Sequence, residues 1–154
     1  MSGTFTQRRR RFPRSAAVLA CAFACGQAHA CWEEAGARYG VNPYLLYAIA
    51  KTESSLNPTV IGPKNKNGTY DIGLMQINSS WLPILRRYGI GEAELLDACT
   101  NIQVGAWILS GKMQQLGNSW TAVGAYNAGK PNLRVAYAQK VYRNLPRVAL
   151  EAQR

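Results

Sequence analysis

Apolar residues recur at intervals of three and four along most of the chain after residue 30, and this period predicts a mainly helical protein. Residues 98–117 form the longest such stretch, with one apolar stripe made of Ile102, Ala106, Leu109, Met113 and Leu116. A second stretch, residues 43–55, starts at an Asn42-Pro43 pair that favours a helix N-terminus and stops before Pro58. We therefore expect a helix over each of these two segments.

Shorter helical stretches lie at both ends of this pattern. Residues 31–39 form a short helix that ends at Gly40, a residue type suited to the left-handed cap position. Ser119 is placed to cap the helix that follows it. Pro131 opens a last helix, whose apolar face consists of Leu133, Tyr137 and Val141.

Between residues 59 and 96 the chain has no long helical stretch. In TVIGPKNKNGTYDIGL, residues 59–74, β-branched residues flank the turn-rich GPKNKNG, which predicts a small β-hairpin. Short helices are expected around residues 80–89 and 91–96. Since the chain has no internal repeat, linker or low-complexity segment, we expect one mainly α (α+β) domain, a helical bundle with a small β-hairpin.

Residues 1–30 have the layout of a secretory signal peptide. A cationic start is followed by the apolar run SAAVLACAFAC, and the small residues of AHA precede Cys31 at a cleavage position. The apolar run is shorter than the roughly 20 residues of a membrane-spanning helix, and no later stretch is long enough either. We therefore expect an exported protein whose domain covers residues 31–154, with an N-terminal anchor helix as the alternative.

Removal of residues 1–30 changes the charge of the protein. The whole chain has 18 Lys and Arg against 8 Asp and Glu, a net charge of +10. Five of the basic residues and none of the acidic ones lie before residue 31, so the remainder carries 13 − 8 = +5. This smaller excess argues against a nucleic-acid partner and favours adsorption to an anionic cell wall.

Cleavage also removes His29, the single histidine of the chain. Without histidine, neither a Ser-His-Asp or Cys-His catalytic arrangement nor a His-ligated metal site can form. The chain also lacks a glycine-rich phosphate loop. We therefore expect no cofactor and no metal. Carboxylates, amides and aromatic rings remain, which are the groups that glycan-processing enzymes use.

Two cysteines, Cys31 and Cys99, remain after Cys21 and Cys25 are lost with the signal peptide. An even pair in a protein sent to an oxidising compartment predicts a disulfide. Such a bond would join the new N-terminus to the middle of the chain and would contribute roughly 4 kcal/mol of stability.

Glu53 stands near the end of the apolar run AIAKTESSLNP, in which Lys51 is the only other charge. It follows Ile49 by four residues and Leu46 by seven, so it shares the helix face that packs inward. Burial raises the pKa of a carboxyl group, and a protonated glutamate can donate its proton to a leaving oxygen. Glu53 is thus a candidate general acid; from the spacing alone, an inert glutamate at an exposed helix end is the alternative.

Three ordered blocks, ESSLNP (residues 53–58), GLMQIN (73–78) and AYNAG (125–129), resemble the catalytic domain of family 1 lytic transglycosylases, which has a lysozyme-like fold. The resemblance runs from Cys31 to about Leu145. It is strongest with the small single-domain members that accompany secretion, conjugation and pilus machines, which commonly have a cysteine pair. The resemblance implies cleavage of the β-1,4 bond between N-acetylmuramic acid and N-acetylglucosamine in peptidoglycan, with formation of 1,6-anhydromuramic ends.

The resemblance also implies roles for individual residues. Glu53 would protonate the glycosidic oxygen and then, as a carboxylate, take a proton from the sugar's own C6 hydroxyl as that group attacks C1. Gln76 would offer amide hydrogen bonds to the substrate, and Met75 would form an apolar floor of the groove. Tyr126 matches the tyrosine whose hydroxyl reaches the catalytic glutamate, and Asn127 lies beside it. The alternative for Tyr126 is a core tyrosine bonded to the backbone.

Further candidates come from their positions. Ser54 is expected either to bind substrate or to tie down the loop after its helix. Tyr137 corresponds to a groove tyrosine in the family's last helix. Four tryptophans are able to stack on sugar rings, although we expect Trp107 to belong to the core: Trp32, Trp81, Trp107 and Trp120.

Asp71 departs from the commonest family pattern, which has a small residue at this place before GLMQ. It follows Glu53 by 71 − 53 = 18 residues. This is similar to animal lysozymes, in which a glutamate on a helix and an aspartate on the next strand flank the scissile bond. A second carboxylate in the groove would permit hydrolysis by water; the alternative is that Asp71 holds the hairpin by binding backbone NH groups.

Three functions therefore remain open. The main expectation is a lytic transglycosylase that opens the cell wall locally for an envelope-spanning secretion, conjugation or pilus apparatus. The second is a lysozyme-type muramidase that hydrolyses the same bond with Glu53 and Asp71, and the third is a non-catalytic glycan-binding subunit. The expected partners are peptidoglycan strands and a component of such a machine. We expect a periplasmic, wall-associated monomer with no membrane span.

Overall fold

The computed structural model describes residues 30–151. A helix over residues 30–39 comes first, and the remaining elements follow in chain order. They are α2 (Pro43–Ser54), β1 (Asp71–Ile72), β2 (Ile77–Asn78), the 3₁₀ helix η1 (Ser79–Trp81), α3 (Leu82–Leu85), the 3₁₀ helices η2 (Arg86–Tyr88) and η3 (Glu94–Leu96), α4 (Ala98–Leu116), α5 (Trp120–Asn127), α6 (Pro131–Arg143) and α7 (Arg147–Glu151).

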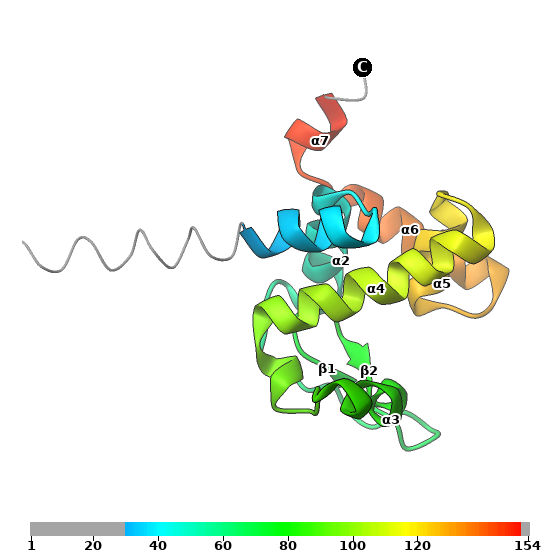
Figure 1. Ribbon diagram of the computed structural model, residues 1–154. Helices are drawn as coiled ribbons and strands as arrows, with labels where there is room; N and C mark the ends of the chain where they lie inside the picture. The colour runs from blue at the N-terminus through cyan, green and yellow to red at the C-terminus, as the bar shows by residue number, and fades with distance from the viewer. Residues whose placement is uncertain (1–29, 152–154) are drawn as a thin grey trace, which may run out of the picture.

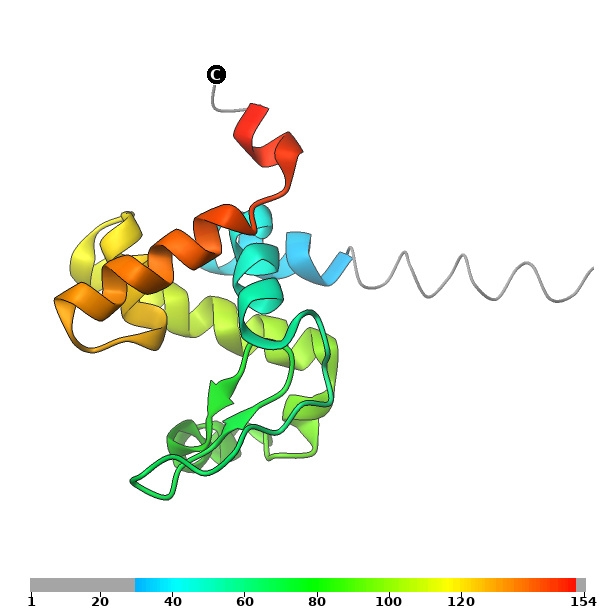
Figure 2. The ribbon, with the colours of Figure 1, turned by 180° about the vertical axis from the view of Figure 1, so that it is seen from behind.

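The elements form two parts that meet along α4 (Figure 1). The small sheet and α3 lie on one side of α4, and α2, the helix over residues 30–39 and α7 lie on the other. Seen from behind, α6 packs against α2, and the chain leaves the end of α2 toward the sheet (Figure 2). The end of α2 therefore lies where the helical part and the sheet part meet.

Local sequence signals fix where the main helices begin. The side chain of Asn42 accepts a hydrogen bond from the backbone N–H of Tyr44, and Pro43 occupies the first turn of α2. Asp97 and Ser119 cap α4 and α5 in the same way, through the N–H groups of Thr100 and Ala122. Each cap satisfies a backbone donor that has no partner within its helix. The helices expected from the sequence are therefore present.

The hydrophobic core lies between α2, α4, α6, η3 and the sheet. Its largest fully buried apolar side chains are Leu46, Ile49, Ile72, Met75, Ile77, Leu95, Ile102, Leu109 and Val141. The apolar stripe expected on α4 is buried at Ile102, Ala106 and Leu109, but it ends at Leu116, which is exposed. Of the face expected on the last helix, Leu133 is likewise exposed. The amphipathic period therefore extends about one turn beyond the core at these two helix ends.

The sheet contains a short form of the expected hairpin and adds a second strand pair. β1 pairs antiparallel with β2, with Asp71 opposite Asn78, whereas the first expected arm contributes a single bridge between Ile61 and Ile72. Gly73 explains the pairing, because its φ of 75° and a hydrogen bond from the N–H of Gln76 to its carbonyl form a tight turn between the strands. The expected hairpin around GPKNKNG is present in short form, since the N–H of Gly62 binds the carbonyl of Asp71 over 2.8 Å and the N–H of Gly73 binds that of Val60 over 2.7 Å. The pairing of β1 with β2 was not expected from the sequence.

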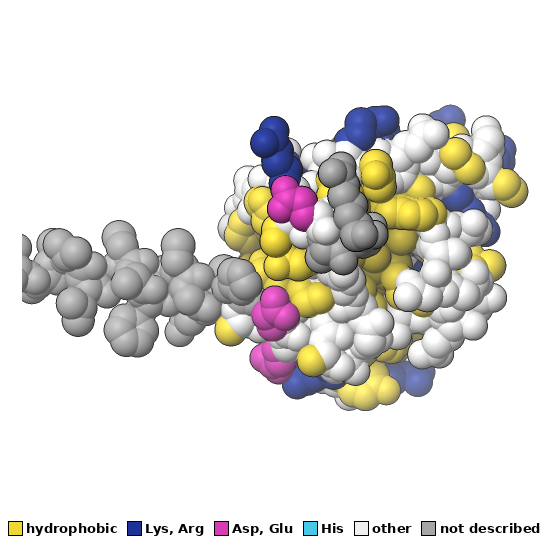
Figure 3. Space-filling model, turned by 90° about the horizontal axis from the view of Figure 1, so that it is seen from above, with side chains coloured by type: hydrophobic (Ala, Val, Ile, Leu, Met, Phe, Trp, Pro, Cys, Tyr) yellow, Lys and Arg dark blue, Asp and Glu magenta, His cyan; other side chains and the backbone are white. Residues whose placement is uncertain are grey.

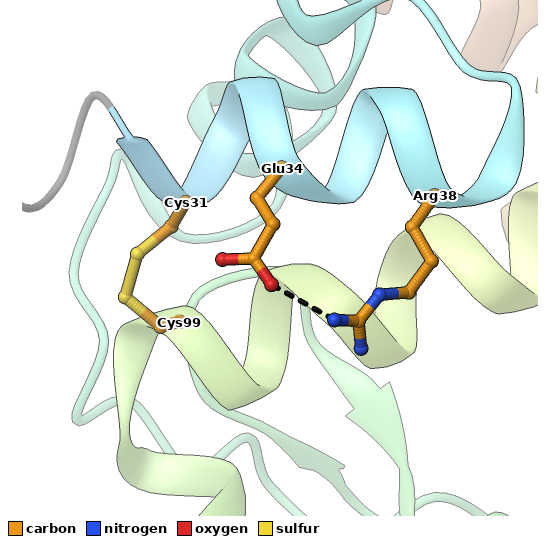
Figure 4. A network of polar contacts seen from close by, with 4 residues as sticks. All are labelled: Cys31, Glu34, Arg38 and Cys99. Carbon is orange, nitrogen blue, oxygen red and sulfur yellow. Dashed lines mark hydrogen bonds and ion pairs between the residues drawn. A yellow bond between two sulfur atoms is a disulfide. The ribbon is translucent and has the colours of Figure 1, made fainter.

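A disulfide joins Cys31 to Cys99, 68 residues apart in the chain, with 5.4 Å between their Cα atoms. It attaches the helix over residues 30–39 to the first turn of α4 (Figure 4). One turn further along, Glu34 and Arg38 form an ion pair of 2.9 Å on the exposed side of that helix. Among residues 30–151, no helix is long and apolar enough to cross a lipid bilayer.

Candidate active site

Glu53 lies in the last turn of α2, where the helix ends in an unusual backbone conformation. Ser55 and Leu56 have φ values of 55° and 67°, in the left-handed region that non-glycine residues rarely adopt. The N–H of Ser55 closes the helix by binding the carbonyl of Lys51. The chain turns away directly after Glu53, so its side chain stands at an edge of the helical part.

The carboxylate of Glu53 has two side-chain partners from distant helices. The hydroxyl of Tyr137 on α6 donates a hydrogen bond of 2.5 Å to Oε1, and the amide of Asn127 at the end of α5 donates to the same atom over 3.4 Å. Burial raises the pKa of Glu53 above its usual value, the two hydrogen bonds oppose that rise, and the negative charge of Asp71 adds to it. The balance favours the protonated acid more than in an exposed glutamate.

A cavity of about 380 Å³ opens over this carboxyl group. Its walls come from α2, the sheet, α4 and α5. The lining residues are Glu53, Asn65, Asp71, Gln76, Ile77, Asn78, Trp81, Ile108, Tyr126 and Asn127. Amide, hydroxyl and carboxyl groups with an indole ring form a lining suited to hydroxylated sugars, which combine polar edges with apolar faces.

Ser54 ties the end of α2 to the sheet part. Its hydroxyl donates to the carbonyl of Leu74 over 2.7 Å and accepts from the N–H of Asn57 over 3.1 Å. Ser54 is not among the residues that line the cavity. The geometry fits the second expectation for Ser54, a structural tie that holds the neighbouring Glu53 in place.

Gln76 lines the cavity, and its amide is engaged with the backbone. Its Nε2 donates to the carbonyl of Gly73 over 2.9 Å and to that of Val60 over 3.2 Å. Its own φ is 50°, a left-handed value held by the turn that starts at Gly73. The side chain therefore braces the turn between β1 and β2 while facing the cavity.

Met75 lies elsewhere than expected. Its side chain is fully buried and is not part of the cavity wall. It fills the space left by the missing side chain of Gly105 on α4, where an added Cβ would lie 2.4 Å from its sulfur. The expectation of an apolar groove floor at Met75 was therefore wrong, because the close approach of α4 draws this side chain into the core.

Tyr126 follows the alternative expected for it, a core tyrosine bonded to the backbone. Its hydroxyl donates to the carbonyl of Met75 over 2.9 Å, whereas the tyrosine bonded to Glu53 is Tyr137. The reason is that α6 packs against α2. Tyr126 still lines the cavity. Burial raises the pKa of Tyr126 and of Tyr137, and the charge of Glu53 adds to both, so both tyrosines remain hydrogen-bond donors.

Asp71 lies in the same cavity as Glu53, at the start of β1. Its carboxylate accepts a hydrogen bond of 2.8 Å from the amide of Asn78, its cross-strand partner. The Asn78 amide also donates to the hydroxyl of Thr69 over 3.1 Å. Asp71 therefore bonds to a side-chain amide of the sheet and not to the backbone NH groups that the sequence suggested as an alternative. A second carboxyl group thus lines the cavity.

Several residues of the site were not identified from the sequence. Asn78 stands inside the GLMQIN block, so that motif was the available signal for it. Asn101 is fully buried on α4; it accepts from the N–H of Met75 over 2.7 Å and donates to the carbonyls of Ile72 and Leu95 over 3.0 and 2.7 Å. A lone amide on an apolar helix face was the signal for it. Asn101 holds the turn that carries Gln76.

Trp81 is the tryptophan that lines the cavity. Its ring packs edge-to-face on Trp107, with 5.2 Å between the ring centroids. Trp107 is 37% exposed, so the expectation of a core position for it was wrong. Trp107 on α4 therefore packs against the ring that lines the cavity and is itself partly exposed to solvent.

The sequence matches a known protein family over most of its length. Residues 30–144 match the family described as "Transglycosylase SLT domain". The chain is 46% identical over 119 residues to invasion protein IagB of Salmonella typhimurium, and the alignment covers 74% of each protein. It is 40% identical over 128 residues to protein IpgF of Shigella flexneri, covering 80% of this chain and 84% of that protein.

A solved structure has a similar fold. It is an inactive mutant of the lytic transglycosylase Slt from Pseudomonas aeruginosa, in which a glutamine replaces a glutamate. The TM-score is 0.57 at 22% sequence identity, and the match covers 75% of this chain but 22% of that chain. The mainly helical, lysozyme-like fold expected from the sequence is thus confirmed, with the domain here corresponding to a small part of the longer protein.

Proposed function

The chain belongs to the Transglycosylase SLT domain family, and on that premise we propose that Glu53 is its catalytic acid and base. As a member of this family, the protein is a peptidoglycan lytic transglycosylase. The observation that supports the assignment to Glu53 is its position in a cavity lined by polar groups. Its carboxyl group has a raised pKa and accepts hydrogen bonds from Tyr137 and Asn127.

The first step breaks the glycosidic bond. Glu53, in its protonated form, gives its proton to the oxygen that joins C1 of N-acetylmuramic acid to N-acetylglucosamine, and the C1–O bond breaks. Positive charge develops at the sugar ring as this bond breaks. The substrate's N-acetyl group would stabilise that charge, and so would the carboxylate of Asp71, which lines the same cavity. The leaving sugar departs with a free hydroxyl group.

The second step closes the anhydro ring. The C6 hydroxyl of the muramic acid attacks C1, and its proton passes to the Glu53 carboxylate formed in the first step. The proton balance is restored without a water molecule, so one carboxyl group serves first as acid and then as base. Tyr137 favours this exchange because its hydroxyl, a neutral donor, stabilises the carboxylate between the two steps.

Other residues of the cavity would bind and orient the glycan. Gln76, Asn127 and Tyr126 line the cavity and offer hydrogen-bonding groups, and Trp81 offers a ring for stacking on a sugar. Ser54 and Met75, which lie outside the lining, act by supporting the walls. We propose no cofactor for this chemistry, since the acid, the base and the nucleophile come from Glu53 and the substrate.

We further propose that the enzyme acts outside the cytoplasm, in the service of an envelope-spanning apparatus. Peptidoglycan lies outside the cytoplasmic membrane, residues 1–30 resemble a signal peptide, and the disulfide between Cys31 and Cys99 is consistent with export. The Salmonella relative is named an invasion protein, which supports a role in local opening of the wall for secretion.

Analysis of the products tests this assignment. Purified peptidoglycan treated with the protein should release 1,6-anhydromuropeptides, identified by mass spectrometry, and Glu53→Gln should release none. Glu33→Gln is the matched control, since Glu33 is an exposed glutamate on the helix over residues 30–39. Normal release by Glu53→Gln would remove Glu53 from the mechanism.

A second outcome is favoured by the position of Asp71 in the same cavity. If a water molecule rather than the C6 hydroxyl attacked C1, Asp71 would stabilise the charge or act as nucleophile, and the products would have reducing ends. Asp71→Asn distinguishes the two reactions. A hydrolase should lose its reducing-end products in this variant, whereas a transglycosylase that uses Glu53 alone should keep forming anhydro ends.

A further inference from the structure

A second concave surface lies on the outer side of α6, apart from the cavity over Glu53. It is a groove of about 500 Å³ between the first turn of α5 and the length of α6. We call it the α5–α6 groove; its apolar wall includes Trp120, Pro131, Val135 and Tyr142, and Arg134 and Arg143 also line it. None of these residues lines the cavity over Glu53.

The α5–α6 groove and the active site use different faces of one helix. Pro131, Val135 and Tyr142 share one side of α6, at spacings of four and seven residues. Tyr137, which holds Glu53, lies on a side turned about 140° away, and Val141 is fully buried in the core. The groove is therefore an additional surface and not a continuation of the glycan site.

Large apolar side chains are exposed in this groove. Val135 is 59% exposed, Tyr142 50% and Trp120 44%. The rings of Trp120 and Tyr142 hold each other edge-to-face, with 5.5 Å between their centroids. Contiguous apolar surface of this kind, rimmed by polar groups, typically marks a binding surface. Pre-arranged aromatic rings also provide the anchor points that protein interfaces favour.

The charge around the groove has one sign. Residues 98–150 contain no Asp or Glu, and their basic residues are Lys112, Lys130, Arg134, Lys140, Arg143 and Arg147. In the view from above, the acidic side chains visible among the described residues lie in the half of the molecule toward residues 30–39, and the other half shows Lys and Arg (Figure 3). A partner that fills the groove must therefore be apolar at its centre and acidic at its edges.

The segments of the sequence outside the described residues carry no acidic side chain. Residues 1–29 contain five arginines and no carboxylate side chain, and residues 152–154 end in Arg154. Of the acidic residues that a second copy could present, Glu33 and Glu151 are exposed, whereas Glu34 pairs with Arg38 and Asp97 caps α4. Glu92 and Glu94 are likewise bonded, to the hydroxyl of Tyr70 and the N–H of Gly91.

We propose that the α5–α6 groove binds an amphipathic helix of a partner protein, with aliphatic side chains on one face and carboxylates on both flanks. The wall from Pro131 to Arg143 is roughly 18 Å long, the length of about three helical turns. The aliphatic face meets Val135, Tyr142 and Trp120, and the carboxylates meet Arg134 and Arg143. This inference goes beyond the proposed function, because it concerns a surface that takes no part in cleavage.

Fluorescence anisotropy with a synthetic peptide tests the proposal. The probe is a fluorescein-labelled helix of about 14 residues, with Leu at i, i+3, i+4 and i+7 and Glu on both flanks. The matched control peptide has Lys in place of every Glu. The acidic peptide should bind the purified protein saturably and about tenfold more tightly than the Lys peptide, with an affinity that falls as salt rises. Equal binding of the two peptides, or no saturable binding, overturns the proposal.

Variants locate the binding on the protein. Val135→Asp should weaken binding of the acidic peptide by about tenfold or more, and Arg143→Glu should reverse the preference toward the Lys peptide. Ile84→Asp is the matched control, since Ile84 on α3 is a 41% exposed apolar residue outside the groove. Circular dichroism and muropeptide release should be unchanged in Val135→Asp, so a binding loss reports on the groove alone.

Two other occupants would contradict the proposal. Phosphatidylglycerol vesicles that sediment the protein in a manner dependent on Val135, with no peptide binding, would identify a lipid surface instead. A dimer in sedimentation equilibrium that Val135→Asp dissociates would identify a second copy of this chain. An acidic peptide that binds in a Val135-dependent manner, with neither of these results, supports the partner helix.

Discussion

The hydroxyl of Tyr137 donates a 2.5 Å hydrogen bond to the carboxylate of Glu53, although 84 residues separate the two in the chain. The contact exists because α6 packs against the end of α2. Next to it, the amide of Asn144 at the end of α6 donates to the hydroxyl of Thr52 over 3.0 Å. The register between these two helices therefore determines how the catalytic carboxyl group is held.

The hydrogen bond from Tyr137 to Glu53 should affect how activity depends on pH. The Tyr137 hydrogen bond lowers the pKa of Glu53, so Tyr137→Phe should raise that pKa further. The acid form required for the first step would then persist to higher pH, and the alkaline limb of kcat/KM should move upward. The measurement is the pH profile of turbidity loss in a peptidoglycan suspension. A limb that stays in place would show that Tyr137 does not act on this titration.

Asp71→Asn should move the same limb in the opposite direction. The negative charge of Asp71 raises the pKa of Glu53, so its removal lowers that pKa and shifts the alkaline limb to lower pH. The two variants serve as controls for each other. If both moved the limb in the same direction, the electrostatic account of the site would be wrong.

Glu53 should also reduce stability at neutral pH. Its pKa in the folded protein lies above the ordinary value of 4.5, so the folded state holds this proton more tightly than the unfolded chain does. The free energy of unfolding therefore falls as pH rises from about 4.5 through the raised pKa. Glu53→Gln should be more stable than the wild type at pH 7 and should lose that advantage at pH 4, as measured by urea denaturation. A variant less stable than the wild type at pH 7 would contradict this.

Two glycines should respond in opposite ways to substitution by alanine. A Cβ on Gly124 of α5 would lie 2.4 Å from the carbonyl oxygen of Arg134, so Gly124→Ala must push α5 and α6 apart. We expect a net destabilisation of roughly 1–3 kcal/mol. Gly111 of α4 has no atom within 4 Å of that position, so Gly111→Ala should stabilise by up to about 1 kcal/mol. Chemical denaturation of both variants checks the pair, and equal effects would refute the packing argument.

The disulfide should make a large contribution to stability. It closes a loop of 68 residues, and loss of this cross-link should cost about 4 kcal/mol in the chain-entropy account. Cys99→Ser, Cys31→Ser and the double variant should all unfold at a similarly lowered denaturant concentration. The wild type in a reducing agent should match them. An unchanged midpoint under reducing conditions would show that the bond adds little.

Much of the fold was predictable because its signals are local. Asn42, Asp97 and Ser119 each cap a helix within three residues of their own position, and such contacts can be read directly from the sequence. The pairing of β1 with β2 was not predictable in this way. It depends on the left-handed turn from Gly73 to Gln76, whose geometry is held by the buried amide of Asn101 on α4.

The site shows the same division. Glu53 could be proposed from its apolar helix and its motif. Which helix supplies its tyrosine partner could not be predicted, because that depends on how the helices pack. The AYNAG block suggested Tyr126, whereas the packing of α6 on α2 brings Tyr137 to Glu53. Likewise, nothing near Met75 in the sequence indicates that Gly105 leaves room for its side chain in the core.

The central claim is that Glu53 cleaves the glycan with no participation of water. The most direct measurement is digestion of peptidoglycan in water labelled with heavy oxygen, with immediate borohydride reduction and mass analysis of the muropeptides. The account predicts anhydromuramic products that contain no heavy oxygen, and no products from Glu53→Gln. One heavy oxygen atom in each new muramic acid end would contradict it and would assign the reaction to hydrolysis.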